Sequence, residues 1–339
     1  MSSRDKILAI MNKNNAGTPG YWKGNPHPDA LDIYLDHFNE NSEEELSIFL
    51  GDDLRWRHAE TSYFDPNGRP MFDCHLGNEK KSHGQPGVFA DTEDVRDVEK
   101  FPWPDLKYLD FSEYRKTARR TLDEGLAFFG GFWCPYYHLV ADFFGMENYF
   151  IKMYENPAVV EAVTWHVVDF FDRANEILFD EMGDLIDVFF FGNDFGTQLD
   201  LMISPDMFRK FVLPGIKRLT ATAKKYNKKT MLHSCGAISS AIPMIIDAGV
   251  DGIHPLQAKA AGMDAVTLSR EFGRDLVFMG GVDTQQLLPF GKPKEIMEEV
   301  RRLIDIFGPD YIISPSHEAL LSNVSPENLL AMSRAAKGV

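Results

Sequence analysis

The sequence predicts an α/β protein built as a (β/α)8 barrel. From about residue 111 onward, amphipathic helical segments alternate with short apolar runs of strand length, a pattern typical of parallel βαβ units. Polar residues follow directly after these runs, and the carboxyl ends of the strands form the rim that carries barrel active sites. A doubly wound open sheet would show the same alternation. No G-x-G-x-x-G motif follows a predicted strand, however, so its dinucleotide-binding version has no support.

The amino-terminal part is expected to contribute helices and the first strand. Residues 1 to about 15 should form a helix, a strand lies near Tyr21, and helices follow at Asp29–Phe38 and Glu43–Leu50. The stretch at about 52–110 has little periodicity and many Gly, Pro, Asp and aromatic residues. We expect it to be an irregular insertion with short antiparallel strands that decorates the barrel and also provides one barrel strand.

The regular part of the chain consists of helix–strand units. With the strand near Tyr21 and the one from the irregular stretch, eight barrel strands are expected. The units are Phe111–Glu124 with Leu126–Trp133, Glu147–Glu181 with Ile186–Phe191, Pro205–Lys225 with Thr230–His233, Ile238–Ala248 with Gly252–His254, Ala260–Phe272 with Leu276–Gly280, and Pro293–Phe307 with Tyr311–Ser314.

Length and charge limit the domain organisation and the partners. A chain of 339 residues with 44% hydrophobic content has room for two ordinary domains or one large barrel. The continuous alternation favours a single domain over residues 1–339. The 35 Lys and Arg against 51 Asp and Glu give a net charge of −16 without a basic cluster, which argues against a nucleic-acid partner.

The cysteines and the hydropathy pattern indicate the compartment. The chain has three cysteines, an odd number at irregular spacing: Cys74, Cys134 and Cys235. A disulfide framework is therefore not expected, and we expect a reducing, cytoplasmic setting. No apolar run approaches the roughly 20 residues of a membrane span, and the first residues lack the apolar region of a signal peptide. No membrane partner is therefore expected. The oligomeric state stays open, and the sequence is compatible with a homodimer.

The tripeptide His233-Ser234-Cys235 is the strongest candidate for chemistry. It ends a predicted strand, so an imidazole and a thiolate two residues apart project into one loop and can share a Zn²⁺ ion. The alternative is structural, because free Cys is often a small buried apolar residue and His a hydrogen-bonded core residue. His317, after the last predicted strand, would be the third metal ligand; its alternative is an exposed loop histidine.

Further candidates follow other predicted strands. Asp194 is a candidate catalytic residue that could orient a ligand histidine or act as a base, and its alternative is a helix N-cap. Gln198 lies in the same Gly-rich loop, and Asp283 follows Gly280-Gly281. The aromatic and polar residues near strand ends could line a substrate pocket or serve only in packing. The predicted substrate-binding residues are Trp133, Tyr137, Gln198, His254, Gln257 and Asp283.

Several segments together resemble the uroporphyrinogen decarboxylase superfamily. The resemblance covers about residues 100–335 and implies a (β/α)8 barrel with its pocket at the carboxyl ends of the strands. The segments are Phe144-Gly145-Met146-Glu147, Leu201–Phe208, Leu232-His233-Ser234-Cys235-Gly236, Ala248–Gln257, Met279–Gln285, Leu288–Pro293, Ser314-Pro315-Ser316-His317, Asn328 and Ala331-Met332.

Two branches of that superfamily are distinguished by motifs. Its decarboxylases carry an Arg-Gln-Ala-Gly-Arg segment near the amino terminus, whereas Tyr21–Asp36 contains one Lys and no Arg. Its zinc methyltransferases carry H-x-C and a distant Cys, and here His233 and Cys235 match while His317 stands where that Cys would be. The resemblance thus implies a zinc-dependent methyltransferase. The D-x-H-x-x-G motif of cobalamin carrier domains is absent, so the cobalamin (corrinoid) would be held by a separate carrier protein.

The predicted reaction moves a methyl group between a small methylated compound and the cobalt of that corrinoid protein. One Cys and two neutral His would leave a zinc ion with a formal charge of 2 − 1 = +1, which favours polarising the heteroatom of a donor such as an O-methyl aromatic ether. The alternative is a metal-free decarboxylase acting on a carboxylated substrate, with Asp194 as its charged residue.

Overall fold

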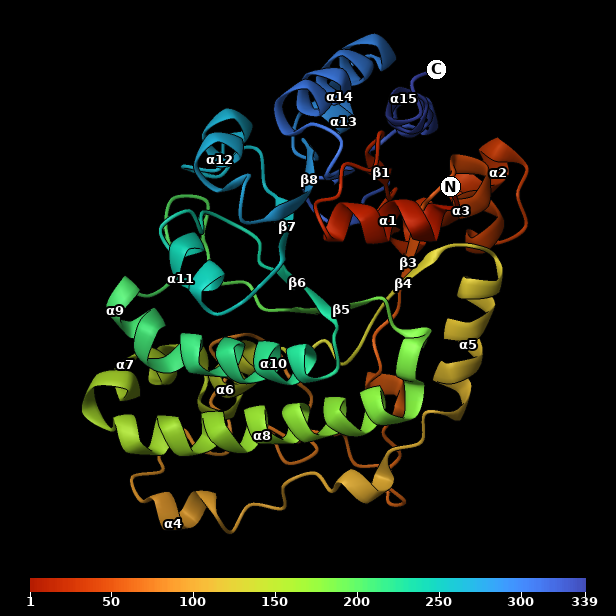
Figure 1. Cartoon of the computed structure of the whole chain (residues 1–339). Helices are drawn as coiled ribbons and strands as arrows, with labels where there is room; N and C mark the ends of the chain where they lie inside the picture. The colour runs from red at the N-terminus through yellow and green to blue at the C-terminus, as the bar shows by residue number, and fades with distance from the viewer.

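Eight parallel strands close into a barrel in a computed structural model that describes residues 1–339 (Figure 1). Their order is β1-β9-β8-β7-β6-β5-β4-β3, and the Asp53 N–H donates to the Tyr21 carbonyl oxygen at 2.9 Å, joining the two end strands. The predicted (β/α)8 barrel is therefore confirmed. The strands are β1 (Gly20–Tyr21), β3 (Leu54–Trp56), β4 (Ala127–Gly130), β5 (Val188–Gly192), β6 (Lys229–His233), β7 (Gly252–Leu256), β8 (Val277–Val282) and β9 (Tyr311–Pro315).

Helices surround the barrel on all sides. In Figure 1, α8 and α10 lie side by side along one flank, and α14 and α15 cover the opposite one. A short parallel pair, β2 (Asn25–Pro26) with β10 (Ala319–Leu320), lies outside the barrel sheet. The helices are α1 (Ser3–Met11), α2 (Pro28–Phe38), α3 (Glu43–Leu50), α4 (Val95–Val98), α5 (Ser112–Asp123), α6 (Tyr136–Phe144), α7 (Met146–Glu155), α8 (Pro157–Met182), α9 (Pro205–Met207), α10 (Leu213–Lys225), α11 (Ile242–Asp247), α12 (Ala265–Phe272), α13 (Leu287–Phe290), α14 (Pro293–Phe307) and α15 (Pro326–Ala336).

One predicted helix is divided in two at a proline, and another contains a π-helical turn. The stretch predicted as one helix over Glu147–Glu181 is α7 followed by α8, with the break at Asn156. Pro157 disfavours helical geometry in the residue before it but fits the first position of a new helix. The predicted helix Pro205–Lys225 starts with α9 and continues through a π-helical turn, Phe208–Val212, into α10.

One buried cluster fills the inside of the barrel. Every second side chain of a strand points inward, so Val188 and Phe190 of β5 lie inside and Phe189 and Phe191 outside. Side chains of α1 belong to the same inner cluster and close the amino-terminal end of the barrel. The cluster comprises Ile7, Ile10, Met11, Ala16, Trp22, Leu54, Ala127, Phe129, Val188, Phe190, Met231, Val277, Met279 and Ile312.

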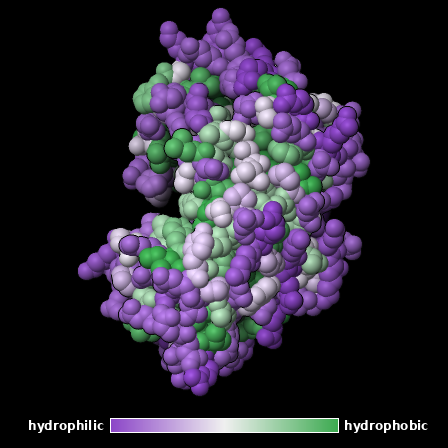
Figure 2. Space-filling view, turned by 90° about the vertical axis from the view of Figure 1, so that its left-hand side faces the viewer, coloured by the Kyte–Doolittle hydropathy of each residue, from purple (hydrophilic) through white to green (hydrophobic).

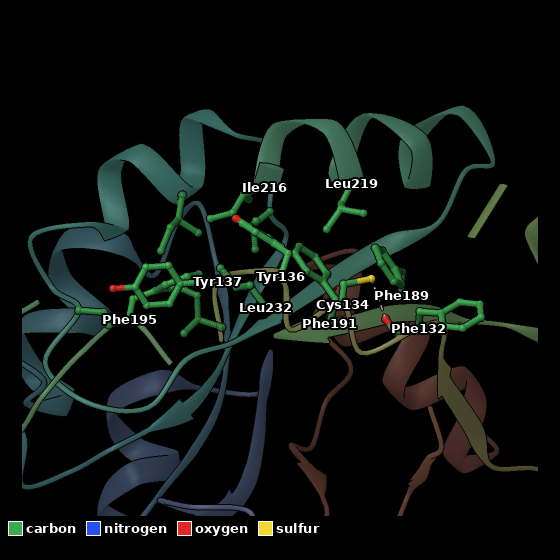
Figure 3. Packing of buried hydrophobic residues seen from close by; sticks show 14 of the residues in the cluster. Phe132, Cys134, Tyr136, Tyr137, Phe189, Phe191, Phe195, Ile216, Leu219 and Leu232 are labelled. Atoms are coloured by element: carbon green, nitrogen blue, oxygen red, sulfur yellow. Dashed lines mark hydrogen bonds between the residues drawn. The ribbon is translucent and has the colours of Figure 1, made fainter. Parts of the chain in front are cut away.

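A second, larger cluster fills the space between the strands and the helices. Figure 3 shows Ile216 and Leu219 of α10 above the outward side chains of β5 and β6, with Cys134 among them. The Cys134 thiol is fully buried and donates to the Phe132 carbonyl oxygen at 3.2 Å. Cys134 is thus a core residue.

The stretch between β3 and α5 is mostly irregular and packs on the outside of the barrel. It passes beneath α8 in the view of Figure 1, where Phe72 contacts Phe170 and Phe171 of that helix through aromatic rings. Instead of short antiparallel strands, it forms a single antiparallel bridge, between Tyr63 and Leu109. The predicted irregular segment at about 52–110 begins with β3 and so also provides one barrel strand. Its description as an insertion in a single domain remains a prediction.

The outer surface is largely polar. The face seen in Figure 2 is hydrophilic over most of its area, and hydrophobic residues show mainly across the middle, where the outline narrows. None of the helices combines the length and apolar character needed to cross a bilayer.

The closure of the barrel depends on Asp53, which gives a first testable prediction. Its buried carboxylate accepts from the Tyr21 N–H at 2.9 Å and from the Ser3 hydroxyl at 2.6 Å, and lies 2.6 Å from the Lys6 ammonium. Replacing Asp53 with Ala leaves these donors unpaired, and we expect the free energy of unfolding to fall by about 2–4 kcal/mol. Urea denaturation measures the change. The control Glu298→Ala, in an exposed pair with Lys294, should change it by no more than about 0.5 kcal/mol; equal effects would contradict this role of Asp53.

Candidate metal centre

His233 and Cys235 lie together at the carboxyl end of β6. His233 is two residues after the inward-facing Met231, so it also points into the barrel, and its side chain is 4% exposed. Its Nε2 lies 3.4 Å from the Cys235 Sγ and 3.2 Å from the Asp194 Oδ1. The ligand atoms of these three residues all lie within 4.8 Å of one another, close enough to share one metal ion. The structure thus brings all three predicted catalytic residues together.

Asp194 links the loops after β5 and β6. Its Oδ1 accepts from the Cys235 N–H at 2.9 Å, and its own N–H donates to the His138 Nε2 at 2.8 Å. The Ser234 hydroxyl accepts from the Phe195 N–H at 3.0 Å in the same pair of loops. These bonds fix the Cys235 backbone relative to His233. Asp194 does not act as a helix N-cap, because its carboxylate accepts a hydrogen bond from the neighbouring loop.

A glycine makes room for His233. A Cβ atom at Gly192, the last residue of β5, would lie 2.5 Å from the His233 Cβ and 2.6 Å from the Trp133 ring. The missing side chain therefore lets both residues occupy the top of the barrel. The Trp133 ring packs edge-on against the imidazole at 5.0 Å between centroids, and so forms one wall of the centre.

His254 lies within the barrel beside His233 and is fully buried. The two Nδ1 atoms are 2.9 Å apart, so one ring donates a hydrogen bond to the other. Burial, together with the charge of His233, holds the pKa of His254 well below its ordinary value. A neutral His254 on Nδ1 keeps the Nε2 of His233 directed toward Cys235 and Asp194.

His317 and Glu318 approach the centre from the carboxyl end of β9. The ligand atoms of Cys235, His317 and Glu318 form a second set within 4.8 Å of one another, so Cys235 is common to both sets. His317 is less enclosed than His233: its side chain is 43% exposed, and its Nδ1 accepts from the Ala319 N–H at 3.1 Å. The Glu318 Oε2 lies 3.8 Å from the His233 Nε2 and is buried without a hydrogen bond.

Negative charge accumulates around the Cys235 thiol. Burial raises its pKa, and the charges of Asp194 and Glu318 raise it further, to well above the ordinary value. Burial alone would also raise the pKa of Asp194, but the hydrogen bond and charge of His233 and the Cys235 N–H outweigh it and hold the carboxyl pKa well below its usual range. A thiolate in these surroundings requires a nearby cation. The nitrogen, sulfur and oxygen donors match those that Zn²⁺ prefers.

A pocket of about 410 Å³ opens beside the centre, at the ends of β7, β8 and β9. Gln257 connects the two, because it lines the pocket while its Oε1 accepts from the Gly236 N–H at 2.6 Å. The lining contains amide, hydroxyl and apolar groups and one imidazole, but no Lys or Arg. The lining residues are Gln257, Thr284, Gln285, His317, Ala319, Leu321, Asn323 and Val324.

The other predicted substrate contacts lie in different settings. The Gln198 Oε1 is 3.5 Å from the Nε2 of Gln285, at the edge of this pocket. Asp283 accepts from the backbone N–H groups of Gln285, Gln286 and Leu287 at 2.9–3.3 Å, so it caps the first turn of α13. Tyr137 packs against Phe195, and Figure 3 shows both at one end of the outer core. The role of these residues in substrate binding remains a prediction.

The sequence did not predict Glu318 at the centre or the contact of His138 with Asp194, although the segment Phe132–His138 was expected to line the pocket. Glu318 directly follows His317, so an acidic residue next to a predicted ligand was the available signal. His138 lies at the end of the aromatic segment that begins at Phe132, and its contact with the Asp194 N–H joins segments 56 residues apart. No local pattern in the sequence marks such a contact.

Two curated relatives align with part of the chain. The Methylated-thiol--coenzyme M methyltransferase of Methanosarcina mazei is 31% identical over 106 residues, which are 30% of this chain and 26% of the relative. The Methylcobamide:CoM methyltransferase MtbA of Methanosarcina acetivorans is 24% identical over 105 residues, which are 31% of this chain and 30% of the relative. The alignments thus span less than a third of either relative.

The whole fold has a counterpart among solved structures. A methyltransferase from Methanosarcina mazei superposes with a TM-score of 0.69 over 100% of this chain and 99% of its own, at 14% sequence identity. At this identity the likeness concerns the fold. The sequence model of the family described as Uroporphyrinogen decarboxylase (URO-D) matches residues 75–339, which is most of the chain and confirms the resemblance seen in its motifs. The chain belongs to the uroporphyrinogen decarboxylase family.

Proposed function

We propose that this protein is a zinc-dependent methyltransferase that moves a methyl group between a small methylated compound and the cobalt of a cobalamin held by a separate carrier protein. The observation that carries the proposal is the convergence of the His233, Cys235 and Asp194 side chains at the carboxyl ends of β5 and β6. Both curated relatives are named methyltransferases, and one name includes methylcobamide as a substrate. These names support the same reaction class.

Two observations support a fit between these residues and a zinc ion. The Glu318 Oε2 is buried without a hydrogen-bond donor, and an unpaired buried carboxylate oxygen is costly unless a cation lies near it. The Cys235 thiol is surrounded by carboxylates that disfavour its ionised form in the absence of positive charge. His233 and Cys235 would hold the ion. When bound, zinc supplies Lewis acidity toward the heteroatom that carries or receives the methyl group.

The surrounding residues hold this arrangement in place. Asp194 fixes the Cys235 backbone, and Gln257 fixes the next peptide through the Gly236 N–H. His254 directs the His233 Nε2, and Trp133 excludes water from one side of the ring. Rigid support of this kind keeps the reacting groups in a productive geometry without reorganisation during the reaction.

The pocket favours a neutral substrate over a carboxylated one. The amide groups of Gln257, Gln285 and Asn323 can donate hydrogen bonds to ether or hydroxyl oxygens. A decarboxylase acting on a carboxylated substrate would need a cationic partner for the carboxylate, and the pocket lining contains no Lys or Arg. An O-methyl aromatic ether is therefore the first compound class to test, and the decarboxylase alternative is disfavoured.

The metal ligands can be tested with a pair of cysteine variants. Cys235→Ser should weaken zinc binding by more than about 100-fold, because it removes a soft donor at the centre. Cys134→Ser is the matched control, since Cys134 lies in the cluster between the strands and the helices. Its replacement should leave the zinc affinity within about threefold of that of the unchanged protein. Competition with a chromophoric chelator measures both affinities. Equal losses from the two substitutions would show that the metal site is misplaced.

The reaction can be followed by the absorbance of the corrinoid. With zinc-loaded protein and cob(I)alamin, we expect an O-methylated phenol to methylate the cobalt, and we expect His233→Ala to slow this by at least about 100-fold because the metal centre is lost. Methylamines and methylated thiols, tested in both directions, serve as comparison substrates. Methylation of a thiol without demethylation of any ether would refute the ether substrate. Absence of methyl transfer with every compound would refute the methyltransferase.

A further inference from the structure

Glu318 has the position and the unmet bonding capacity of a metal ligand. It lies in the loop after β9, and its side chain is 25% exposed. Its Oε2 atom is nevertheless buried and accepts no hydrogen bond from any residue. Buried carboxylate oxygens normally accept hydrogen bonds or bind cations, so this oxygen has unused capacity to bind a cation.

We propose that Glu318, and not His317, is the third protein ligand of the ion held by His233 and Cys235. This inference rests on the zinc ion of the proposed function, and it changes the predicted ligand set from two imidazoles and one thiolate to one imidazole, one thiolate and one carboxylate. The fourth position is left to a water molecule or a substrate heteroatom, as in catalytic zinc sites.

The distances between donor atoms support this set. Zinc ligands lie about 2.0–2.3 Å from the ion, so two ligands of a tetrahedral site are about 3.3–3.8 Å apart. The His233 Nε2 is 3.4 Å from the Cys235 Sγ and 3.8 Å from the Glu318 Oε2. The Cys235 and Glu318 ligand atoms lie within 4.8 Å of each other.

The two competing residues each have a hydrogen-bond partner. The Nδ1 of His317 accepts from the Ala319 N–H at 3.1 Å, and almost half of its side chain is exposed. The Asp194 Oδ1 accepts from the Cys235 N–H at 2.9 Å, which identifies Asp194 as a positioning residue for the thiolate. Glu318 offers a buried oxygen that accepts no hydrogen bond.

The proposed set changes the charge of the centre. A thiolate and a carboxylate on Zn²⁺ give a formal charge of 2 − 1 − 1 = 0, whereas one thiolate and two imidazoles give +1. A neutral centre is a weaker Lewis acid than a cationic one. In this set His317 is not a metal ligand. It lines the pocket beside Gln257 and is placed to contact a bound substrate.

X-ray absorption spectroscopy of the zinc-loaded full-length protein tests the ligand set directly. Multiple scattering from the imidazole ring counts the histidine ligands, so we expect one imidazole and one sulfur per zinc ion. The matched variants are Glu318→Gln and His317→Gln. Glu318→Gln should lower zinc affinity by more than about tenfold, because a neutral amide replaces an anionic ligand, while His317→Gln should change it by less than about threefold.

The outcomes separate this inference from the proposed function. Two imidazoles per zinc ion, or a larger loss of affinity in His317→Gln than in Glu318→Gln, would overturn the role of Glu318. Methyl transfer by the unchanged protein would then still support the methyltransferase. A protein that binds no zinc would overturn both the ligand set and the zinc dependence. Circular dichroism of both variants checks that a loss of affinity does not come from unfolding.

Discussion

Closure of a parallel sheet is the constraint on which the rest of this structure depends. Eight strands that run in one direction place all their carboxyl ends at one rim. The hydrogen bonds between Asp53 and Tyr21 join β3 to β1 and so close the barrel. Because α1 fills the opposite end with apolar side chains, only the carboxyl rim is available for polar chemistry. The loops after β5, β6 and β9 therefore meet, although Asp194, Cys235 and Glu318 are far apart in the sequence.

The alternation of strand side chains determines how the centre is reached. Val188, Phe190 and Met231 fill the lower part of the barrel, and the next inward positions on β5 and β6 are Gly192 and His233. A glycine beside a histidine leaves enough room for the imidazole under the Trp133 ring. The polar centre thus rests on a dry apolar layer, in which electrostatic interactions are stronger than in water.

Acidic groups lie close to the Cys235 thiol at the centre. The hydrogen bond with His233 keeps Asp194 ionised despite burial, while the Cys235 thiol resists ionisation because Asp194 and Glu318 lie nearby. The formal charge of a bound metal ion would therefore depend on which of these groups contacts it. That charge would set the Lewis acidity of the ion and so the preferred substrate. The expectation of a cationic zinc site assumed two imidazole ligands; the buried oxygen of Glu318 argues for a less electrophilic centre.

The sequence by itself determined the barrel, the rim and the His233/Cys235 pair, because periodicity and the two-residue spacing are local properties. It could not determine that Glu318 lies 3.8 Å from His233, that Asp283 caps α13, or that His254 is buried beside His233. The approach of side chains from different strands, and their access to solvent, depend on strand register and on neighbouring side chains. Only the closed tertiary structure decides both.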